Sequence, residues 1–174
     1  KVLCFAHPDD DETMRGAQEA TVQRLYTAAR RNRLEFLLEV VPSKVGPVNV
    51  DTTAALIGRF YRIGICPDWG KLEPMNSDAG WQATCDSIRR HDRYCRGIVV
   101  LGLDAPREDL AACFASAARH DLVKGFAVGR TIFGDAARRW FKTEMSDTEA
   151  VTQMAARYRD LCNIWDVARK GAVA

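Results

Sequence analysis

Short apolar runs alternate with longer amphipathic stretches along this chain, and the alternation repeats five times. Runs of strand length occupy residues 1–6, 34–41, 68–73, 97–103 and 123–128. Helical patterns follow them at about 12–31, 51–63, 77–91, 106–120 and 135–141, and a last helix extends from 146 to about 169. Strands that alternate with helices in units of about thirty residues predict a parallel sheet covered by helices.

Helix-start signals support these boundaries. Ser77 is expected to cap one helix, and Pro106 fits the first turn of the next. Ser146 and Glu149 have the spacing of a capping box at the start of the last helix. The acidic loop of residues 7–11 supplies a cap and negative charge to the first helix.

Two closures of the sheet fit five strand–helix units. One is a complete flavodoxin-like open sheet, and the other is the last five units of a (β/α)8 TIM barrel of roughly 250 residues. Alternation along the second and third strands places Glu39 and Lys71 mid-strand, with Lys71 on the face of Trp69 and Glu73. Such charges are costly between two helix layers, whereas a barrel lumen collects polar groups. The barrel is therefore favoured, as one domain over residues 1–174.

Composition narrows the class of protein without naming a function. A net charge of +2 indicates no nucleic-acid face, and no apolar run is long enough to span a membrane. Six cysteines without a C-x-x-C pair, and three histidines without ligand spacing, predict reduced thiols, no structural zinc and a cytoplasmic protein. The chain starts within a strand at Lys1, without methionine or signal peptide, which predicts a C-terminal fragment of a longer polypeptide.

Three charged residues on the predicted strands are candidates for chemistry. The free amine of Lys71 could attack a carbonyl group, or its ammonium could simply pair with Glu73 or Glu39. Glu39, one strand away, could act as a general acid or base, or as a counter-ion for Lys71 or Lys1. Lys1 heads the first strand and, on the pattern alone, is more simply a surface lysine.

Glycines at the ends of the last two strands are candidates for anion binding. Gly102 and Gly129 allow backbone N–H groups to approach a phosphate, and Arg130 would add charge-assisted hydrogen bonds. The alternative is that these glycines serve turns and that Arg130 is solvated. His7 and Lys44 are weaker candidates, for contact with substrate and with a substrate carboxylate respectively, because loop residues of these types are commonly structural or exposed.

Several stretches resemble a known family along nearly the whole chain. They are KVLCFAHPDD, RLEFLLEVVPSKVGPV, PDWGKLEPM, RGIVVLGLDAP and DLVKGFAVGRTIFGDAAR. They are similar to the C-terminal domain fused to bacterial 5-dehydro-2-deoxygluconokinases of inositol catabolism. That domain resembles, more distantly, the class I tagatose-1,6-bisphosphate aldolases, which are (β/α)8 barrels.

The resemblance implies roles for individual residues. Lys71-Leu72-Glu73 is similar to the K-V-E of the aldolases, which implies a Schiff-base role for Lys71. Leu37-Leu38-Glu39-Val40 resembles their F-L-E-V strand, and Lys1-Val2-Leu3-Cys4 their K-F-L-L strand, which implies that Glu39 and Lys1 belong to the active site. Gly129-Arg130-Thr131 resembles their G-R-A-T stretch near the substrate phosphate. Where the aldolases have tyrosines after the first strand, this chain has Ala6-His7-Pro8.

The function implied by this resemblance is a class I aldolase that needs no metal or other cofactor. It would cleave 6-phospho-5-dehydro-2-deoxy-D-gluconate into dihydroxyacetone phosphate and malonate semialdehyde. Its partners would be a small sugar phosphate and an attached sugar kinase domain, and a homo-oligomer is left open. Two alternatives remain: a non-catalytic sugar-phosphate sensor that regulates the attached kinase, and a self-contained flavodoxin-like binding module.

Overall fold

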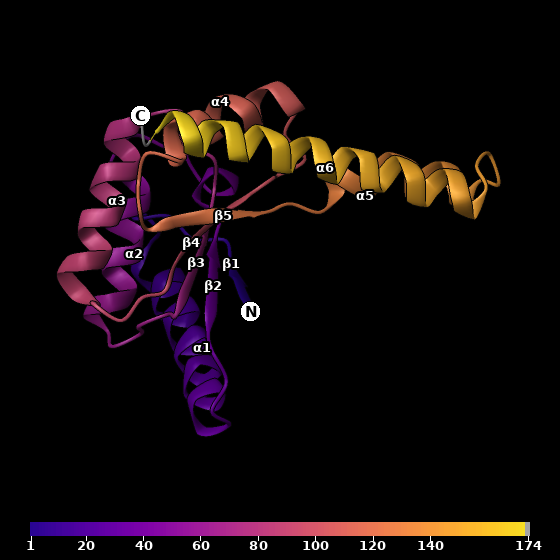
Figure 1. Ribbon diagram of the computed structural model, residues 1–174. Helices are drawn as coiled ribbons and strands as arrows, with labels where there is room; N and C mark the ends of the chain where they lie inside the picture. Colours follow the sequence, from indigo (N-terminus) through magenta and orange to yellow (C-terminus); the bar gives the residue numbers. More distant parts are fainter. Residues whose placement is uncertain (173–174) are drawn as a thin grey trace.

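The strands form one parallel sheet in which the order in space follows the order in the chain, β1-β2-β3-β4-β5 (Figure 1). The computed structural model describes residues 1–172 of the chain. Its elements are β1 (Val2–Cys4), α1 (Glu12–Arg31), β2 (Leu37–Val40), the 3-10 turn η1 (Pro42–Lys44), α2 (Thr52–Arg62), β3 (Trp69–Leu72), α3 (Asp78–His91), β4 (Gly97–Leu101), α4 (Arg107–Ala117), β5 (Val123–Ala127), α5 (Arg130–Phe141) and α6 (Asp147–Gly171).

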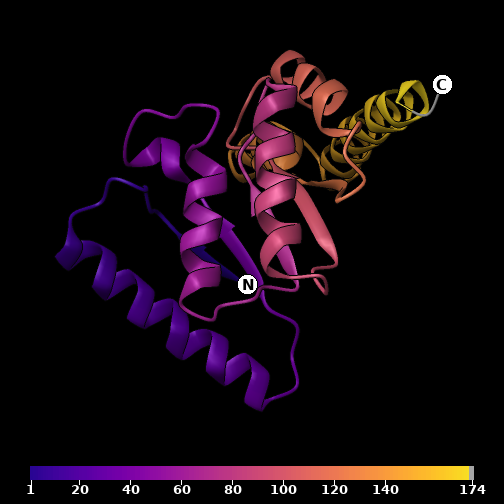
Figure 2. The ribbon, with the colours of Figure 1, turned by 90° about the vertical axis from the view of Figure 1, so that its left-hand side faces the viewer.

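The strand order distinguishes between the two predicted closures. A flavodoxin-like sheet reverses direction after its first strand, whereas this sheet winds in one direction throughout. Figure 2 shows α1, α2 and α3 on the same side of the strands. The five alternating units therefore have the arrangement of consecutive units of a (β/α) barrel-like fold, as predicted, and the flavodoxin-like alternative is wrong.

The two faces of the sheet differ in burial, as the alternation predicted. Leu38, Leu72 and Ile98 point towards the helices and are fully buried. On the opposite face, Leu3 of β1 is 44% exposed. The strand register aligns residues of this second face across the sheet, in the row Leu3, Glu39, Lys71, Val99 and Gly125. Glu39 and Lys71 are thus direct neighbours on the face without helices.

Three of the six α-helices, α1, α3 and α6, begin at a side-chain cap. α1 spans the predicted residues because Asp11 accepts a hydrogen bond from the Met14 N–H at 3.0 Å. Ser77 caps α3, and Ser146 and Glu149 form the predicted capping box of α6. The strands are shorter than predicted because their apolar flanks continue into loops.

Helix α5 begins five residues before the predicted Asp135. Gly129 is its N-cap residue, and the carbonyl oxygen of Gly129 accepts hydrogen bonds from Ile132 N–H at 2.8 Å and Phe133 N–H at 3.1 Å. No polar side chain caps this end, so no capping signal for it could be recognised in the sequence. As a result, the N-terminus of a twelve-residue helix lies directly after β5.

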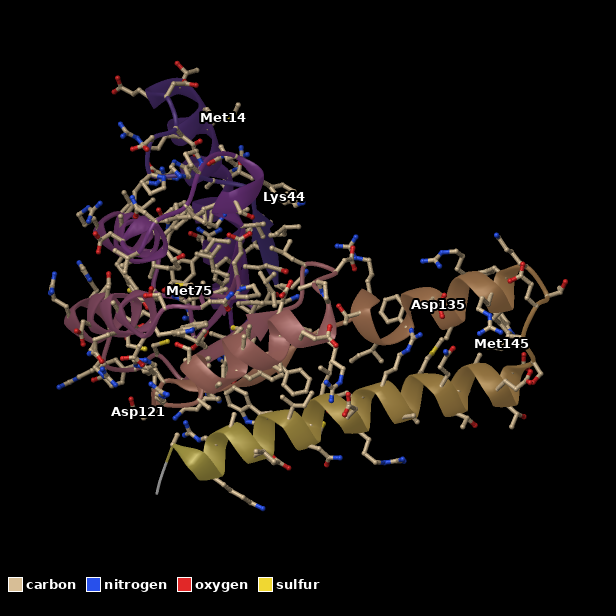
Figure 3. All side chains as sticks on the ribbon, turned by 90° about the horizontal axis from the view of Figure 1, so that it is seen from above. Met14, Lys44, Met75, Asp121, Asp135 and Met145 are labelled. Atoms are coloured by element: carbon tan, nitrogen blue, oxygen red, sulfur yellow. The ribbon has the colours of Figure 1, made fainter. Side chains whose placement is uncertain are left out.

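Helices α5 and α6 run side by side away from the sheet (Figures 1 and 3). Asp135 of α5, labelled in Figure 3, pairs with Arg157 of α6 at 3.0 Å. At the other end of α6, the Trp165 ring packs edge-on against Phe114 of α4, with ring centroids 5.5 Å apart. Helix α6 therefore links the projecting helix α5 to α4.

The six cysteines are free thiols. Burial raises the pKa of the Cys85 thiol to about 11, and the nearby Arg89 opposes this only in part. Burial likewise raises the pKa of the Cys113 thiol to about 11, against a smaller lowering by the Met75 backbone. Both thiols are fully buried and behave as small apolar side chains. Among residues 1–172, no helix combines the length and apolarity needed to cross a membrane.

Asp68 ties α1 to the start of two strands. Its Oδ2 accepts a hydrogen bond from the Phe36 N–H at 2.7 Å and pairs with Arg30 Nη1 at 2.7 Å. Burial alone would raise the pKa of this carboxyl, but the Phe36 N–H and the Arg30 guanidinium outweigh it and lower the pKa. The ionised form is therefore the one that stabilises the fold.

We expect Asp68→Asn to lower the free energy of unfolding at pH 7 by about 1–2 kcal/mol, because a charge-assisted hydrogen bond and an ion pair are lost. A carboxyl whose pKa is lowered on folding stabilises the protein above its unfolded pKa of about 4, and this contribution disappears as the pH falls. Urea unfolding at several pH values should show the two proteins converging towards about pH 2. A difference that stays constant with pH would contradict this role.

Candidate active site

Glu39 lies between two lysines on the helix-free face of the sheet. The register places it beside Lys71, and its Oε1 lies 2.9 Å from Lys71 Nζ. Its Oε2 lies 2.6 Å from Lys1 Nζ. Glu39 is only 7% exposed, so both contacts are largely shielded from solvent on the carboxylate side. The structure thus brings together the three charged residues that the strands were predicted to present.

Opposing effects act on the ionisation of Glu39. Burial would raise the pKa of its carboxyl, but hydrogen bonds from Lys1 and Lys71, together with their charges, lower it below its ordinary value. Glu39 is therefore a carboxylate at neutral pH, and it can accept a proton only when a lysine moves or a substrate displaces it.

A cavity of about 270 Å³ opens over this cluster, at the carboxyl ends of the strands. Its walls include Glu39 and Lys71 from neighbouring strands, Lys44 from η1, and apolar side chains from both edges of the sheet. The lining residues are Leu3, Phe5, Glu39, Val41, Lys44, Lys71, Leu101, Gly102, Leu103, Asp104, Ala127, Gly129, Arg130, Thr131 and Phe133. Six of the eight residues predicted for the site therefore meet in one cavity.

The N-terminus of α5 forms one end of the cavity. The backbone bonds from the first turn start at Ile132 N–H, so the N–H groups of Arg130 and Thr131 have no partner within the helix. The Arg130 guanidinium adds a positive charge and pairs with Asp104 at 2.8 Å. Such a helix end, with glycine at its N-cap, suits the binding of a phosphate or another anion.

Gly102 closes the β4 side of this end. A Cβ atom at Gly102 would lie 2.8 Å from Cγ1 of Val128, which is closer than side-chain atoms approach each other. Leu103 and Asp104 follow with φ angles of 48° and 59°, in the left-handed region. Backbone conformations of this kind are common beside functional sites, and Asp104 in this turn pairs with Arg130.

The two remaining predicted residues do not line the cavity. Lys1 reaches the site only through Glu39, and its side chain is 52% exposed. His7 is buried elsewhere: its Nδ1 accepts the Asp9 N–H at 3.2 Å, and its Nε2 donates to the Pro47 carbonyl at 2.9 Å. These bonds make His7 a loop anchor outside the cavity, and its expected contact with substrate stays a prediction.

Two contacts beside the site were not predicted from the sequence. Glu73 does not pair with Lys71, as one alternative proposed; it accepts hydrogen bonds from the Ser43 N–H at 3.1 Å and from the Ser43 hydroxyl. Asp104 is the partner of Arg130. Within residues 1–172, no group of three or more His, Cys, Asp or Glu side chains is arranged to hold a metal ion.

These features define the class: an α/β protein with one five-stranded parallel sheet and a lysine–carboxylate site at the carboxyl ends of its strands. The chain belongs to the family DUF2090, described as uncharacterized proteins conserved in bacteria, whose model matches residues 1–169. No match was found among the curated proteins.

Proposed function

We propose that this protein is a class I aldolase in which Lys71 forms a Schiff base with a ketose phosphate. One observation carries the proposal: the Lys71 amine faces a cavity, 2.9 Å from the buried carboxylate of Glu39, and the N-terminus of α5 lies in the same cavity. A nucleophile, a proton acceptor and a phosphate site are the parts that a Schiff-base aldolase needs.

The proposed substrate is 6-phospho-5-dehydro-2-deoxy-D-gluconate, and the proposed pathway is myo-inositol catabolism. The phosphate would bind to the N–H groups of Arg130 and Thr131 and to the Arg130 guanidinium. The free amine of Lys71 would then attack the C5 ketone and, with loss of water, form a protonated imine.

The imine accepts the electron pair of the bond that breaks. Glu39 would take the proton of the C3 hydroxyl, the C3–C4 bond would cleave, and malonate semialdehyde would leave. The remaining enamine would be protonated at C4, and water would hydrolyse the imine to release dihydroxyacetone phosphate and free Lys71. Lys1 would hold Glu39 in place while Lys71 is bonded to substrate, because it contacts the other carboxylate oxygen.

In this proposal the five strand–helix units are the last five of the eight units of a (β/α)8 barrel. Catalytic groups of such barrels lie at the carboxyl ends of the strands, where this cavity lies. An attached sugar kinase would supply the phosphorylated substrate, as the sequence resemblance implies.

A second candidate function is a non-catalytic domain that binds a sugar phosphate and regulates an attached 5-dehydro-2-deoxygluconokinase. The direct ion pair between Lys71 and Glu39 favours this regulatory candidate, since an ion pair with a purely structural role would have the same geometry. The α5 helix end would bind the phosphate in either case.

Turnover separates the two candidates. The natural full-length protein, given 6-phospho-5-dehydro-2-deoxy-D-gluconate, should release dihydroxyacetone phosphate, which glycerol-3-phosphate dehydrogenase and NADH report as a fall in absorbance. Ligand-dependent kinase activity without release of dihydroxyacetone phosphate would favour the regulatory domain and would contradict the aldolase.

A further inference from the structure

The cations around the cavity are not equivalent. Lys71 and Lys1 share the carboxylate of Glu39, and Arg130 pairs with Asp104. Lys44 also lines the cavity, but in the part of the chain that the structure describes it forms no ion pair. Lys44 therefore contributes a positive charge to the cavity that no side chain neutralises.

The two ends of the cavity also differ in their supply of backbone donors. At the α5 end, two helix N–H groups are open. At the η1 end, the Ser43 N–H bonds to Glu73, and the Val45 and Gly46 N–H groups both bond to the Pro42 carbonyl, at 2.9 Å and 3.1 Å. The η1 end thus offers a lysine point charge with few free backbone donors, so the α5 end is the better phosphate site and Lys44 is left for a second, smaller anion such as a carboxylate.

Glu73 holds the turn that carries Lys44. Glu73 is 6% exposed, and both of its oxygens accept hydrogen bonds from Ser43, next to Lys44 in η1. It lies two residues after Lys71, directly after β3. Figure 3 shows Lys44 on the side of η1 turned away from α2 and α3. The segment Lys71-Leu72-Glu73 therefore carries the amine of Lys71 and, through the hydrogen bonds from Ser43 to Glu73, also positions Lys44.

We propose that Lys44 is the carboxylate-recognition residue of this cavity, that Glu73 positions it, and that the site selects ligands with a phosphate at one end and a carboxylate at the other. The inference rests on the proposed function for the central role of Lys71, but it concerns binding alone. Lys44 follows β2 and Arg130 follows β5, three strand spacings of roughly 4.8 Å apart, so the two cations reach the cavity from different sides.

A matched pair of ligands tests this selection without any chemistry. Gluconate 6-phosphate and sorbitol 6-phosphate differ only in a carboxylate or a hydroxymethyl group at C1, and neither has a ketone for Lys71 to attack. Isothermal titration calorimetry on the natural full-length protein should show about ten- to a hundredfold tighter binding of gluconate 6-phosphate. Lys44→Met should remove this preference and leave the affinity for sorbitol 6-phosphate unchanged.

Three further variants make the result specific. Glu73→Gln should reduce the preference in the same direction, and Lys44→Arg should restore part of it. Lys142→Met, at an exposed lysine after α5 that does not line the cavity, should leave both affinities unchanged.

Equal affinities of the wild-type protein for the two ligands, or an equal loss of both in Lys44→Met, would overturn the inference. Sorbitol 1,6-bisphosphate bound more tightly than gluconate 6-phosphate would also overturn it, because the η1 end would then hold a phosphate. Carboxylate selection without release of dihydroxyacetone phosphate would instead refute the aldolase and leave this inference standing.

Discussion

Lys71→Met is expected to abolish carbon–carbon bond cleavage while leaving the fold and phosphate binding intact. Methionine cannot form an imine, so kcat should fall by at least roughly a thousandfold. The substitution keeps a long apolar side chain on β3, and Glu39 keeps its contact with Lys1. The measurement is the steady-state release of dihydroxyacetone phosphate, together with circular dichroism of both proteins.

Two controls restrict the interpretation of that loss. Lys142→Met removes an exposed lysine outside the cavity and should retain wild-type turnover. Lys71→Arg keeps the positive charge beside Glu39 but supplies no amine that forms an imine under these conditions, so it should be as inactive as Lys71→Met. Activity retained in Lys71→Arg would show that the charge is needed and the nucleophile is not.

Glu39→Gln is expected to separate the base from the nucleophile. Glutamine has the shape of glutamate and can still accept a hydrogen bond from Lys71, but it cannot take a proton from the substrate hydroxyl. Turnover should therefore fall by about 10²–10⁴-fold, while a covalent adduct with dihydroxyacetone phosphate still forms at Lys71. The comparison combines turnover rates with adduct yields after borohydride reduction.

Loss of both turnover and adduct formation in Glu39→Gln would contradict a role for Glu39 as the base alone. It would show that the carboxylate acts mainly by holding Lys71 in position, because Glu39 is its ion-pair partner at 2.9 Å. Undiminished turnover would remove Glu39 from the chemistry altogether. Measuring the unfolding transition of the variant excludes a trivial loss of structure.

The strand-level arrangement of the site could be predicted because side chains alternate along a strand. The period of two placed Glu39 and Lys71 on the face without helices, and the parallel order placed their strands side by side. Neither the pattern nor the spacing determined which carboxylate Lys71 would contact. That depended on register: Glu39 is directly opposite Lys71 on the neighbouring strand, whereas Glu73 follows the end of β3, two residues after Lys71.

The loop residues were harder to predict because their contacts span long sequence separations. Glu73 bonds to Ser43 thirty residues away, and His7 bonds to Pro47 forty residues away. The start of α5 was missed because Gly129 caps it without a side chain. The turn that brings Asp104 to Arg130 uses two left-handed residues, Leu103 and Asp104, neither of which is a glycine that would signal such a turn.

The central claim is that the Lys71 amine forms an imine, and borohydride trapping tests it most directly. The natural full-length protein would be incubated with dihydroxyacetone phosphate, reduced with sodium borohydride, digested and sequenced by mass spectrometry. The account predicts one reduced adduct, located on Lys71 and absent from Lys71→Met. No adduct on the wild-type protein, or an equal adduct on another lysine such as Lys1 or Lys44 in both proteins, would contradict it.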